Sequence, residues 1–443
     1  MTGTILRRTF AGAVSALAFN TNQASAVDAK PALLGGQPVR PRSKHFPAWP
    51  QVHPQDETPW LEVFRSGRWW RKEGHFVRDF EKTWAQRVGA RHCLAIANGT
   101  SALIASLHAV DVGPKDEVIV GPYTFIATVN AILAHYALPV FVDTDPDSAM
   151  IDAAKIEAAI TPQTRCILPI HLGGNMADMD RIMDISKRRN VAVVEDACQA
   201  VGAEWRGRKA ATIGHLGCFS FHKLKNLSGG EAGAVVTNDD ALFQRAYGFH
   251  SHYRTPDENS ADPKLCRNGI NLRMSEFQAA AMMAQMGRLE DQAKARDENA
   301  AYLSKMLREQ PGVAPAKMYA GCSRNGYHLY MMRYNKEAMS GLPRERFIEA
   351  VRAEGIPIGA GYPPLNKQPF LENTLNSRAF RTVYSKQEID RWRERNHCPA
   401  NDQLCQEGLW FAHTVLLGSH GDMEDIIAAI RKVQRQASSL KRI

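Results

Sequence analysis

The chain has 443 residues, of which 44% are hydrophobic and 23% charged, values ordinary for a globular protein with ample core. Its net charge of +9 is spread along the sequence, with no basic block interleaved with aromatic residues and no apolar run long enough to cross a membrane. These numbers argue against nucleic-acid binding and against a membrane-spanning segment. The length favours one large domain joined to a smaller one, or two comparable domains.

The eight cysteines show no metal-ligand spacing, and several lie inside apolar, strand-like runs such as 165-RCILPI-170. We predict mostly buried thiols, neither a disulfide framework nor a metal site.

The first 26 residues have the pattern of a secretory signal. Arg7 and Arg8 precede the short apolar stretch 10-FAGAVSALAF-19, and 24-ASA-26 is a small-x-small cleavage site. The paired arginines favour the Tat type, which would place the protein in the periplasm or cell envelope. The alternative is an extension without signal function on a cytoplasmic protein. Residues 27–55, rich in Pro and Gly, are predicted to form an extended N-terminal arm.

From about residue 75, strand-like and helical stretches alternate. The apolar runs are 93–97, 117–122, 139–145, 166–171, 191–197, 217–221 and 233–238. This alternation predicts an α/β fold with a mainly parallel sheet sandwiched by helices, which gathers its chemistry at the carboxyl ends of the strands. We place the large domain at 56–285, and a linking helix with a smaller C-terminal α+β domain at 286–443.

Three strand-end positions carry candidate chemistry. The turn 98-NGTS-101 offers backbone N–H groups and two hydroxyls at a helix start, a cradle for phosphate or else a simple cap. Asp196 ends an apolar strand and needs a partner, either a protonated ring nitrogen or a structural arginine. Lys225 lies in a glycine-rich turn, where burial or a neighbouring charge lowers a lysine pKa enough for imine formation, although most lysines are surface charges.

Together with the aromatic Phe125, these parts are what pyridoxal phosphate requires. The carboxylate keeps the pyridine nitrogen protonated, so that the ring accepts electrons, and the lysine holds the aldehyde as an imine. We therefore predict pyridoxal 5'-phosphate as the cofactor.

The sequence resembles the DegT/StrS-type sugar aminotransferases, which are fold-type I pyridoxal-phosphate enzymes, from about residue 35 to 435. The resemblance rests on 98-NGTSAL-103, 122-PYTFIATVNAI-132, 171-HLGGNMADMD-180, 195-EDACQAVGA-203, 219-FSFHKLKNLSGGEAGAVV-236 and 269-GINLRMSEFQAA-280.

The resemblance implies a role for each matching residue. Lys225, five residues after Ser220 and just before Asn226-Leu227, would be the catalytic lysine, with Lys223 at a variable position beside it. The other implied cofactor contacts are Gly99, Thr100 and Ser220 for the phosphate with Ser101 adjoining, Phe125 stacked on the ring, Asp196 at the ring nitrogen, Gln199 at the ring hydroxyl, and Asn271 from a partner subunit. The last contact implies a homodimer with shared active sites.

Two positions depart from the family pattern. Gly173 stands where the family often has an aromatic residue, and Ala232 replaces a glycine, which would be strained if that position needed a positive φ. Neither change touches Lys225 or Asp196.

Within the family, 35-GGQPVR-40, 47-PAWPQ-51, 66-SGRWW-70 and the tail 398–418 look most like glutamine:scyllo-inosose aminotransferases and 3-amino-5-hydroxybenzoate synthases. This implies transfer of an amino group from glutamine or glutamate to a small-molecule keto-cyclitol or keto-sugar. The alternatives are a synthase-like dehydratase and aromatase, or a non-catalytic cofactor-binding sensor or structural dimer. Candidates for the acceptor pocket, each equally explained by packing, are Trp69, Trp70, Arg71, His171, Tyr362, Asn366 and His413.

Overall fold

The structure is a computed structural model that describes residues 30–254 and 268–442. The predicted signal over 1–26 and Cys266 lie outside the described residues. The cysteines that the structure does describe are free thiols, and all but the partly buried Cys198 are buried, as expected.

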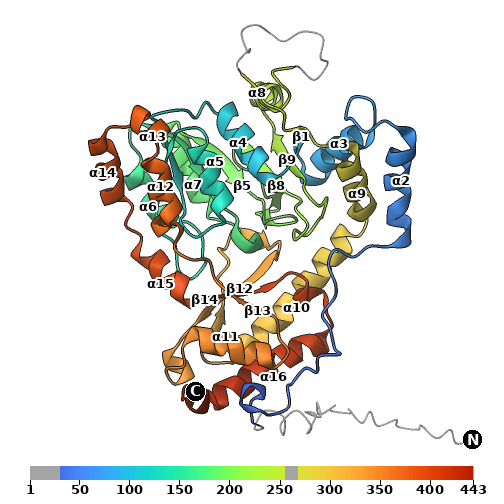
Figure 1. The fold of residues 1–443 in the computed structure, drawn as a ribbon, viewed down its shortest axis with the longest axis vertical. Helices are drawn as coiled ribbons and strands as arrows, with labels where there is room; N and C mark the ends of the chain where they lie inside the picture. Colours follow the sequence, from blue (N-terminus) through green and yellow to red (C-terminus); the bar gives the residue numbers. More distant parts are fainter. Residues whose placement is uncertain (1–29, 255–267, 443) are drawn as a thin grey trace, which may run out of the picture.

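A seven-stranded sheet forms the large domain (Figure 1). The strand order is β1-β9-β8-β5-β4-β2-β3, and the neighbours are parallel except where β9 pairs with β1 and β8. The strands are β1 (His92–Ile96), β2 (Glu117–Val120), β3 (Leu138–Phe141), β4 (Thr164–Leu168), β5 (Ala192–Asp196), β8 (Leu216–Ser220) and β9 (Gly233–Thr237). The predicted fold class, α/β with a mainly parallel mixed sheet, is confirmed.

The strands are almost wholly buried because helices cover the sheet. These helices are α3 (Phe76–Val88), α4 (Gly99–Ala109), α5 (Ile126–Leu133), α6 (Ala153–Ala159), α7 (Met179–Arg189) and α8 (Asp240–His250), with α2 (Glu57–Ser66) and α9 (Glu276–Met286) beside α3. Asn98, Asp178 and Asp239 cap the helices that follow them by accepting backbone N–H bonds. The helix starts therefore lie where the strands end.

The smaller domain is an antiparallel four-stranded sheet with helices against it (Figure 1). Its strands, in the order β10-β12-β14-β13, are β10 (Val313–Pro315), β12 (Leu329–Tyr334), β14 (Gly408–Ala412) and β13 (Ile358–Ala360). The helices are α10 (Leu289–Arg308), α11 (Arg344–Ala353), α16 (His420–Arg435) and α17 (Ala437–Leu440). The long α10 lies within the region 286–443, where the sequence predicts a linking helix.

Residues 365–405 depart from the predicted division at 286, because they return to the large domain. They form α12 (Pro369–Leu375), α13 (Arg378–Val383) and α14 (Lys386–Arg395), near α6 and α7 in Figure 1, and most of α15 (Pro399–Glu407), which leads toward β14. Their apolar side chains belong to the large core. Trp392 donates its indole N–H to Pro139 O at 2.6 Å, and Asn396 Oδ1 accepts from Phe141 N at 2.9 Å. A small sheet of β6 (Glu204–Trp205), β7 (Arg208–Lys209) and β11 (Cys322–Arg324) also joins the two parts.

A buried ion pair of the small domain holds the start of the described part of the N-terminal arm. Lys432 Nζ lies 2.9 Å from Glu354 Oε2, with side chains 2% and 0% exposed. The same carboxylate accepts from Ala32 N at 2.8 Å and Val39 N at 2.9 Å, and Lys432 Nζ donates to Gln37 O. Polar partners therefore satisfy both buried charges and tie the arm to the small domain.

Lys432→Met should lower the free energy of unfolding by about 3–5 kcal/mol, because it leaves the Glu354 charge buried without its cation. Lys386→Met is the matched control, since Lys386 pairs with Asp390 at the surface, where the lysine side chain is 87% exposed. Urea unfolding of both variants measures the difference. Equal urea midpoints for the two variants would contradict a stabilising role for the Lys432–Glu354 ion pair.

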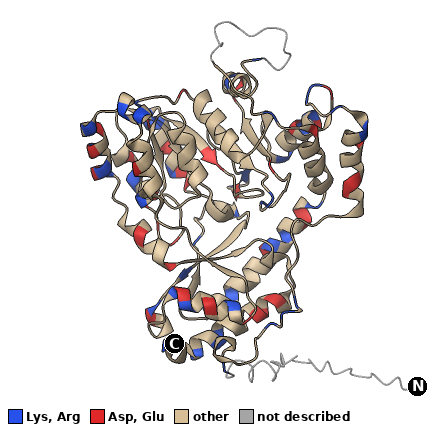
Figure 2. Cartoon of the chain, viewed as in Figure 1, with Lys and Arg blue, Asp and Glu red and all other residues tan. Residues whose placement is uncertain are grey.

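Charged side chains of both signs are interspersed over the outer helices (Figure 2). On α14, for example, Asp390 pairs with both Lys386 and Arg393. Within the described ranges, no helix is long and apolar enough to cross a membrane, and no group of three or more acidic, histidine or cysteine side chains is placed to hold a metal ion.

Candidate active site

The carboxyl ends of β1, β5 and β8 bring Gly99, Asp196 and Ser220 to one edge of the sheet. Gly99 opens α4, and Ser220 is the last residue of β8. A Cβ at Gly99 would lie 2.6 Å from Ser220 Cβ and 2.9 Å from Cys198 Sγ. Only glycine leaves this space open, so that the backbone N–H groups at the start of α4 and the Ser220 hydroxyl form a small cradle suited to a phosphate.

Asp196 is a buried carboxylate, 4% exposed, held by neutral donors. Its Oδ2 accepts from the Thr128 hydroxyl at 2.8 Å, and its Oδ1 accepts from Cys198 N at 3.1 Å. No ion pair to Asp196 is found in the part of the chain that the structure describes. A carboxylate in this setting fits a protonated ring nitrogen as its cationic partner.

Lys225 lies in the turn between β8 and β9 and faces the same region. Burial lowers the pKa of its amine below the usual value, while the nearby Cys198 and Asp196 act in the opposite direction. A lowered pKa makes the free amine more available near neutral pH. Lys223 is exposed to solvent instead. The cradle, the carboxylate and the lysine together fit pyridoxal phosphate.

Thr128 contacts the Asp196 carboxylate, although the sequence did not mark it as a candidate site residue. It lies in the first turn of α5, three residues after Phe125, and also contacts the Thr124 hydroxyl at 3.1 Å. Phe125 precedes α5 and is 54% exposed, and the bond from Thr128 to Asp196 places this end of α5 beside the carboxylate. Thr128 stood within the motif 122–132, but a threonine in a helix gives no signal of its own.

Gln199 and Tyr362 meet across the two domains. Gln199 Nε2 donates to the Tyr362 hydroxyl at 3.1 Å, and Gln199 Oε1 accepts from Gly173 N at 2.8 Å. Gly173 has a φ of 64°, a conformation that favours glycine over the aromatic residue of the family pattern. Of the seven acceptor-pocket candidates, Tyr362 contacts a predicted cofactor residue through its side chain, and His171 does so through its backbone N–H, which donates to Asp196 O at 3.0 Å.

Arg71 and His171 are not available to a substrate, which corrects their assignment to the acceptor pocket. Arg71 is 7% exposed and makes a bidentate pair with Glu81. His171 is fully buried; its Nδ1 accepts from Ala177 N at 3.2 Å, so its Nε2 carries the proton and donates to Glu195 at 2.8 Å. The polar atoms of both side chains are hydrogen-bonded to other residues of the protein.

The other candidates fall into three places. Trp69 and Trp70 are exposed, and Trp69 packs 5.5 Å from Phe277, centroid to centroid. Asn366 is tied to Asn396 O and to Asn401 near α15. His413 is 2% exposed and contacts the carbonyl oxygen of Leu224 beside Lys225. Of these four side chains, His413 contacts the turn that carries Lys225.

The remaining predicted residues lie as follows. Thr100 is half-buried, and Ser101 is buried with its N–H bonded to the capping Asn98. Asn271 is exposed, where a second chain can reach it. Ala232 is fully buried without a positive φ, so the replacement of glycine there causes no strain.

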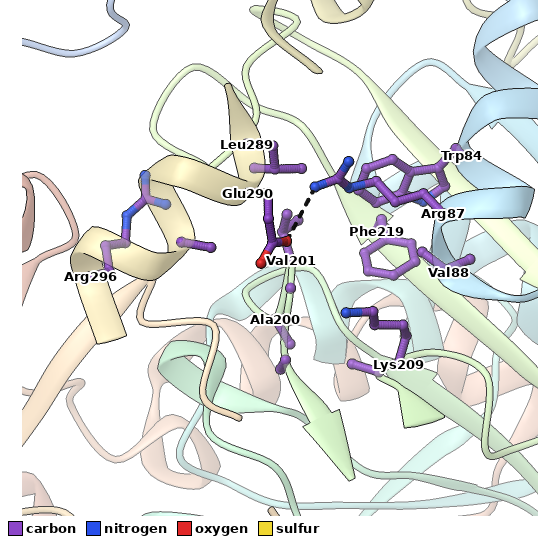
Figure 3. A pocket seen from close by; sticks show the side chains of 14 residues that line it. Trp84, Arg87, Val88, Ala200, Val201, Lys209, Phe219, Leu289, Glu290 and Arg296 are labelled. Carbon is purple, nitrogen blue, oxygen red and sulfur yellow. Dashed lines mark ion pairs between the residues drawn. The ribbon is translucent and has the colours of Figure 1, made fainter. Parts of the chain in front are cut away.

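A separate small cavity lies behind β8 (Figure 3). It measures about 20 Å³ and is bordered by Trp84, Phe219 and the Arg87–Glu290 ion pair, whose charged atoms are 3.6 Å apart. A space of this size holds about one water molecule. It is therefore too small for a cofactor or a substrate.

Gly99→Ala should weaken pyridoxal-phosphate binding by about tenfold or more. The new methyl group displaces the residues of the cradle, and such overpacking costs roughly 1–3 kcal/mol of free energy. Gly113→Ala is the control, since a Cβ there meets nothing within 4 Å. Titration of cofactor-free protein with pyridoxal phosphate measures both affinities. Unchanged affinity in the Gly99 variant would remove the cradle from the site.

Comparisons with known proteins find similar sequences and similar structures over most of the chain. The sequence profile of the DegT/DnrJ/EryC1/StrS aminotransferase family matches residues 53–431. L-glutamine:2-deoxy-scyllo-inosose aminotransferase of Streptoalloteichus tenebrarius is 35% identical over 426 residues, covering 93% of this chain and 99% of the relative. 3-Amino-5-hydroxybenzoate synthase of Amycolatopsis mediterranei is 33% identical over 388 residues, or 86% of this chain and 95% of that protein.

Among solved structures, that of a 3-amino-5-hydroxybenzoic acid synthase superposes with a TM-score of 0.78 at 32% identity. It covers 88% of this chain and 99% of the other.

Proposed function

This chain belongs to the DegT/DnrJ/EryC1/StrS aminotransferase family, and on that premise we propose that it transfers an amino group from L-glutamine to a keto-cyclitol of the scyllo-inosose type. The enzyme is a pyridoxal-phosphate-dependent aminotransferase. The observation that carries the proposal is the meeting of Lys225, Asp196 and the Gly99–Ser220 cradle at one sheet edge. The choice of donor and acceptor follows the printed activity of the 35%-identical relative.

The residues of the site would have separate roles in binding the cofactor and in moving protons. Pyridoxal phosphate, when bound, supplies an aldehyde that carries the amino group and a ring that accepts electrons. The cradle at Gly99 and Ser220 would hold the phosphate, and Asp196 would hold the proton on the ring nitrogen. Lys225 Nζ would attach the cofactor and, once freed, take the proton from the donor Cα as a general base. Phe125 and Gln199 would orient the ring.

The proposal is tested by incubating the enzyme with glutamine labelled with ¹⁵N at the α-amino group and with 2-deoxy-scyllo-inosose. We expect an aminocyclitol that carries the label, detected by mass spectrometry. A reaction with glutamine but with none of a panel of keto-cyclitols and keto-sugars would reject the acceptor class.

A synthase-like dehydration and aromatisation is the second candidate, favoured by the relative from Amycolatopsis mediterranei. It would use Lys225 to remove protons from a carbocycle. Formation of a product with aromatic ultraviolet absorbance, without label from glutamine, would select it.

We further propose a homodimer in which Asn271 of each chain completes the other site. The exposed aromatic side chains of Trp60, Phe64 and Trp69 support this, since they stack in sequence at centroid distances of 6.1 and 6.2 Å and offer an apolar face to a second copy. Mixing Lys225→Ala and Asn271→Ala variants, each inactive alone, should restore one site per mixed dimer. No recovery would count against shared sites.

The export of this enzyme is also a proposal, supported by Arg7, Arg8 and the site 24–26. Arg7→Lys together with Arg8→Lys should stop transport of the folded enzyme if the signal is of the Tat type. Fractionation of cells expressing each form measures it.

A further inference from the structure

The turn that carries Lys225 is held from outside by two side chains. The indole N–H of Trp49, a residue of the N-terminal arm, donates to Lys223 O at 3.0 Å. His413, just after β14 of the small domain, contacts Leu224 O through Nε2 at 3.1 Å. The two backbone carbonyls immediately before Lys225 are thus fixed by other parts of the chain.

Arg296 decides which nitrogen of His413 carries the proton. Arg296 Nη2 lies 3.2 Å from His413 Nδ1, and a guanidinium can only donate. Nδ1 must therefore accept, and the proton lies on Nε2, which donates to Leu224 O. Burial and the charge of Arg296 lower the pKa of His413 to about 3, so the ring stays neutral at physiological pH.

The three side chains form one packed unit, the Trp49–Arg296–His413 cluster. The rings of Trp49 and His413 meet edge to face at 4.5 Å, and the Arg296 guanidinium lies 5.7 Å from the Trp49 ring. Arg296 also lines the small cavity, where Figure 3 shows its side chain on the opposite side from Trp84 and Phe219.

The burial of Arg296 lowers the stability of the fold, because its charge is removed from water. Arg296 is 1% exposed, its Nε and Nη1 have no hydrogen-bond partner among the described residues, and burial lowers its pKa to about 9. Among the described residues no carboxylate forms an ion pair with Arg296, although the charge of Asp297 acts on it, so the burial of this cation calls for a reason other than stability. Such a reason is that Arg296 orients His413 toward the turn that carries Lys225.

The far side of Lys225 is fixed as well. Asn226 donates from Nδ2 to Gly326 O at 2.7 Å, and Lys225 N donates to His222 O at 2.8 Å. Hydrogen bonds therefore hold the residues on both sides of the lysine, and we expect the direction of Nζ to depend on these few bonds.

We propose that Trp49, His413 and Arg296 are positioning residues for Lys225. Through Trp49, the N-terminal arm then contributes to the active site. The proposal rests on Lys225 being the residue that attaches the cofactor. A small displacement of a reacting group lowers the rate without a matching loss of substrate binding.

The test compares Trp49→Phe with Trp392→Phe. Both substitutions remove an indole-to-carbonyl hydrogen bond and keep an aromatic ring, but the Trp392 bond to Pro139 O lies in the large domain, away from the turn. A second pair compares His413→Phe with His413→Gln, which retains an N–H for Leu224 O and an oxygen for Arg296. The readouts are thermal unfolding, kcat and KM for glutamine, and the rate at which cofactor-free protein captures pyridoxal phosphate.

We expect Trp49→Phe and His413→Phe to lower both kcat and the capture rate by about tenfold with KM nearly unchanged, whereas Trp392→Phe and His413→Gln stay near wild type. If Trp49→Phe behaves as Trp392→Phe does, the positioning role is wrong. Should His413→Phe fail to fold, the tryptophan pair decides alone. Covalent capture by a Lys225→Ala variant would instead overturn the assignment of the lysine itself.

Discussion

Lys225→Ala is expected to abolish covalent attachment of pyridoxal phosphate and to lower the rate of amino transfer by about 10⁴-fold or more. The variant loses both the amine that binds the aldehyde and the base that moves the Cα proton. Lys223→Ala should retain the visible absorption band of the bound cofactor, because Lys223 is exposed and its contact with Trp49 is made by its backbone carbonyl oxygen, which the substitution keeps. Absorption spectroscopy and a transamination assay on both variants measure this difference.

The pH dependence of cofactor capture adds a check on the same lysine. Only the neutral amine attaches the aldehyde, so the capture rate should rise as pH rises through the pKa of Lys225. Because burial lowers that pKa, the midpoint should lie below the usual lysine value of 10.5. A midpoint at or above the usual value would show that the amine is not buried as described.

Asp196→Asn is expected to lower kcat by about 10²–10³-fold while the cofactor remains covalently attached, because the amide is uncharged and no longer holds the proton on the ring nitrogen. Cys198 N can still donate to the amide oxygen, and the Thr128 hydroxyl can accept from the amide N–H, so the local hydrogen bonding is largely kept. Steady-state kinetics and the absorption spectrum measure the two effects separately.

Asp143→Asn is the control for this substitution. Asp143 is also buried, 8% exposed, but it accepts from Asn401 N and Ala400 N at the start of α15. We expect this variant to lose stability and to keep kcat once folded. Equal kcat losses in the Asp143 and Asp196 variants would mean that the Asp196 effect is structural.

The strand-end residues were predictable because a parallel sheet forces the carboxyl ends of its strands to one edge. The position of Asp196 at the end of an apolar run therefore marked it as a candidate from the sequence, whereas the role of Ser220 came from the family resemblance. Lys225 needed the family resemblance, since a lysine in a glycine-rich turn is ordinarily a surface charge.

The contributions from distant segments were not predictable. Trp49 and His413 reach the catalytic turn over 174 and 189 positions of sequence separation, and no local pattern encodes such a contact. The return of residues 365–405 to the large core was hidden for the same reason, because an amphipathic helix shows that it buries one face but not against which domain.

The most direct measurement of the proposed function is the visible absorption spectrum of the purified enzyme during a half-reaction. Addition of L-glutamine should bleach the band of the lysine-bound cofactor, and subsequent addition of 2-deoxy-scyllo-inosose should restore it. A band that responds to neither glutamine nor glutamate, and is not restored by any keto-cyclitol or keto-sugar, would contradict the assignment as an aminotransferase of this substrate class.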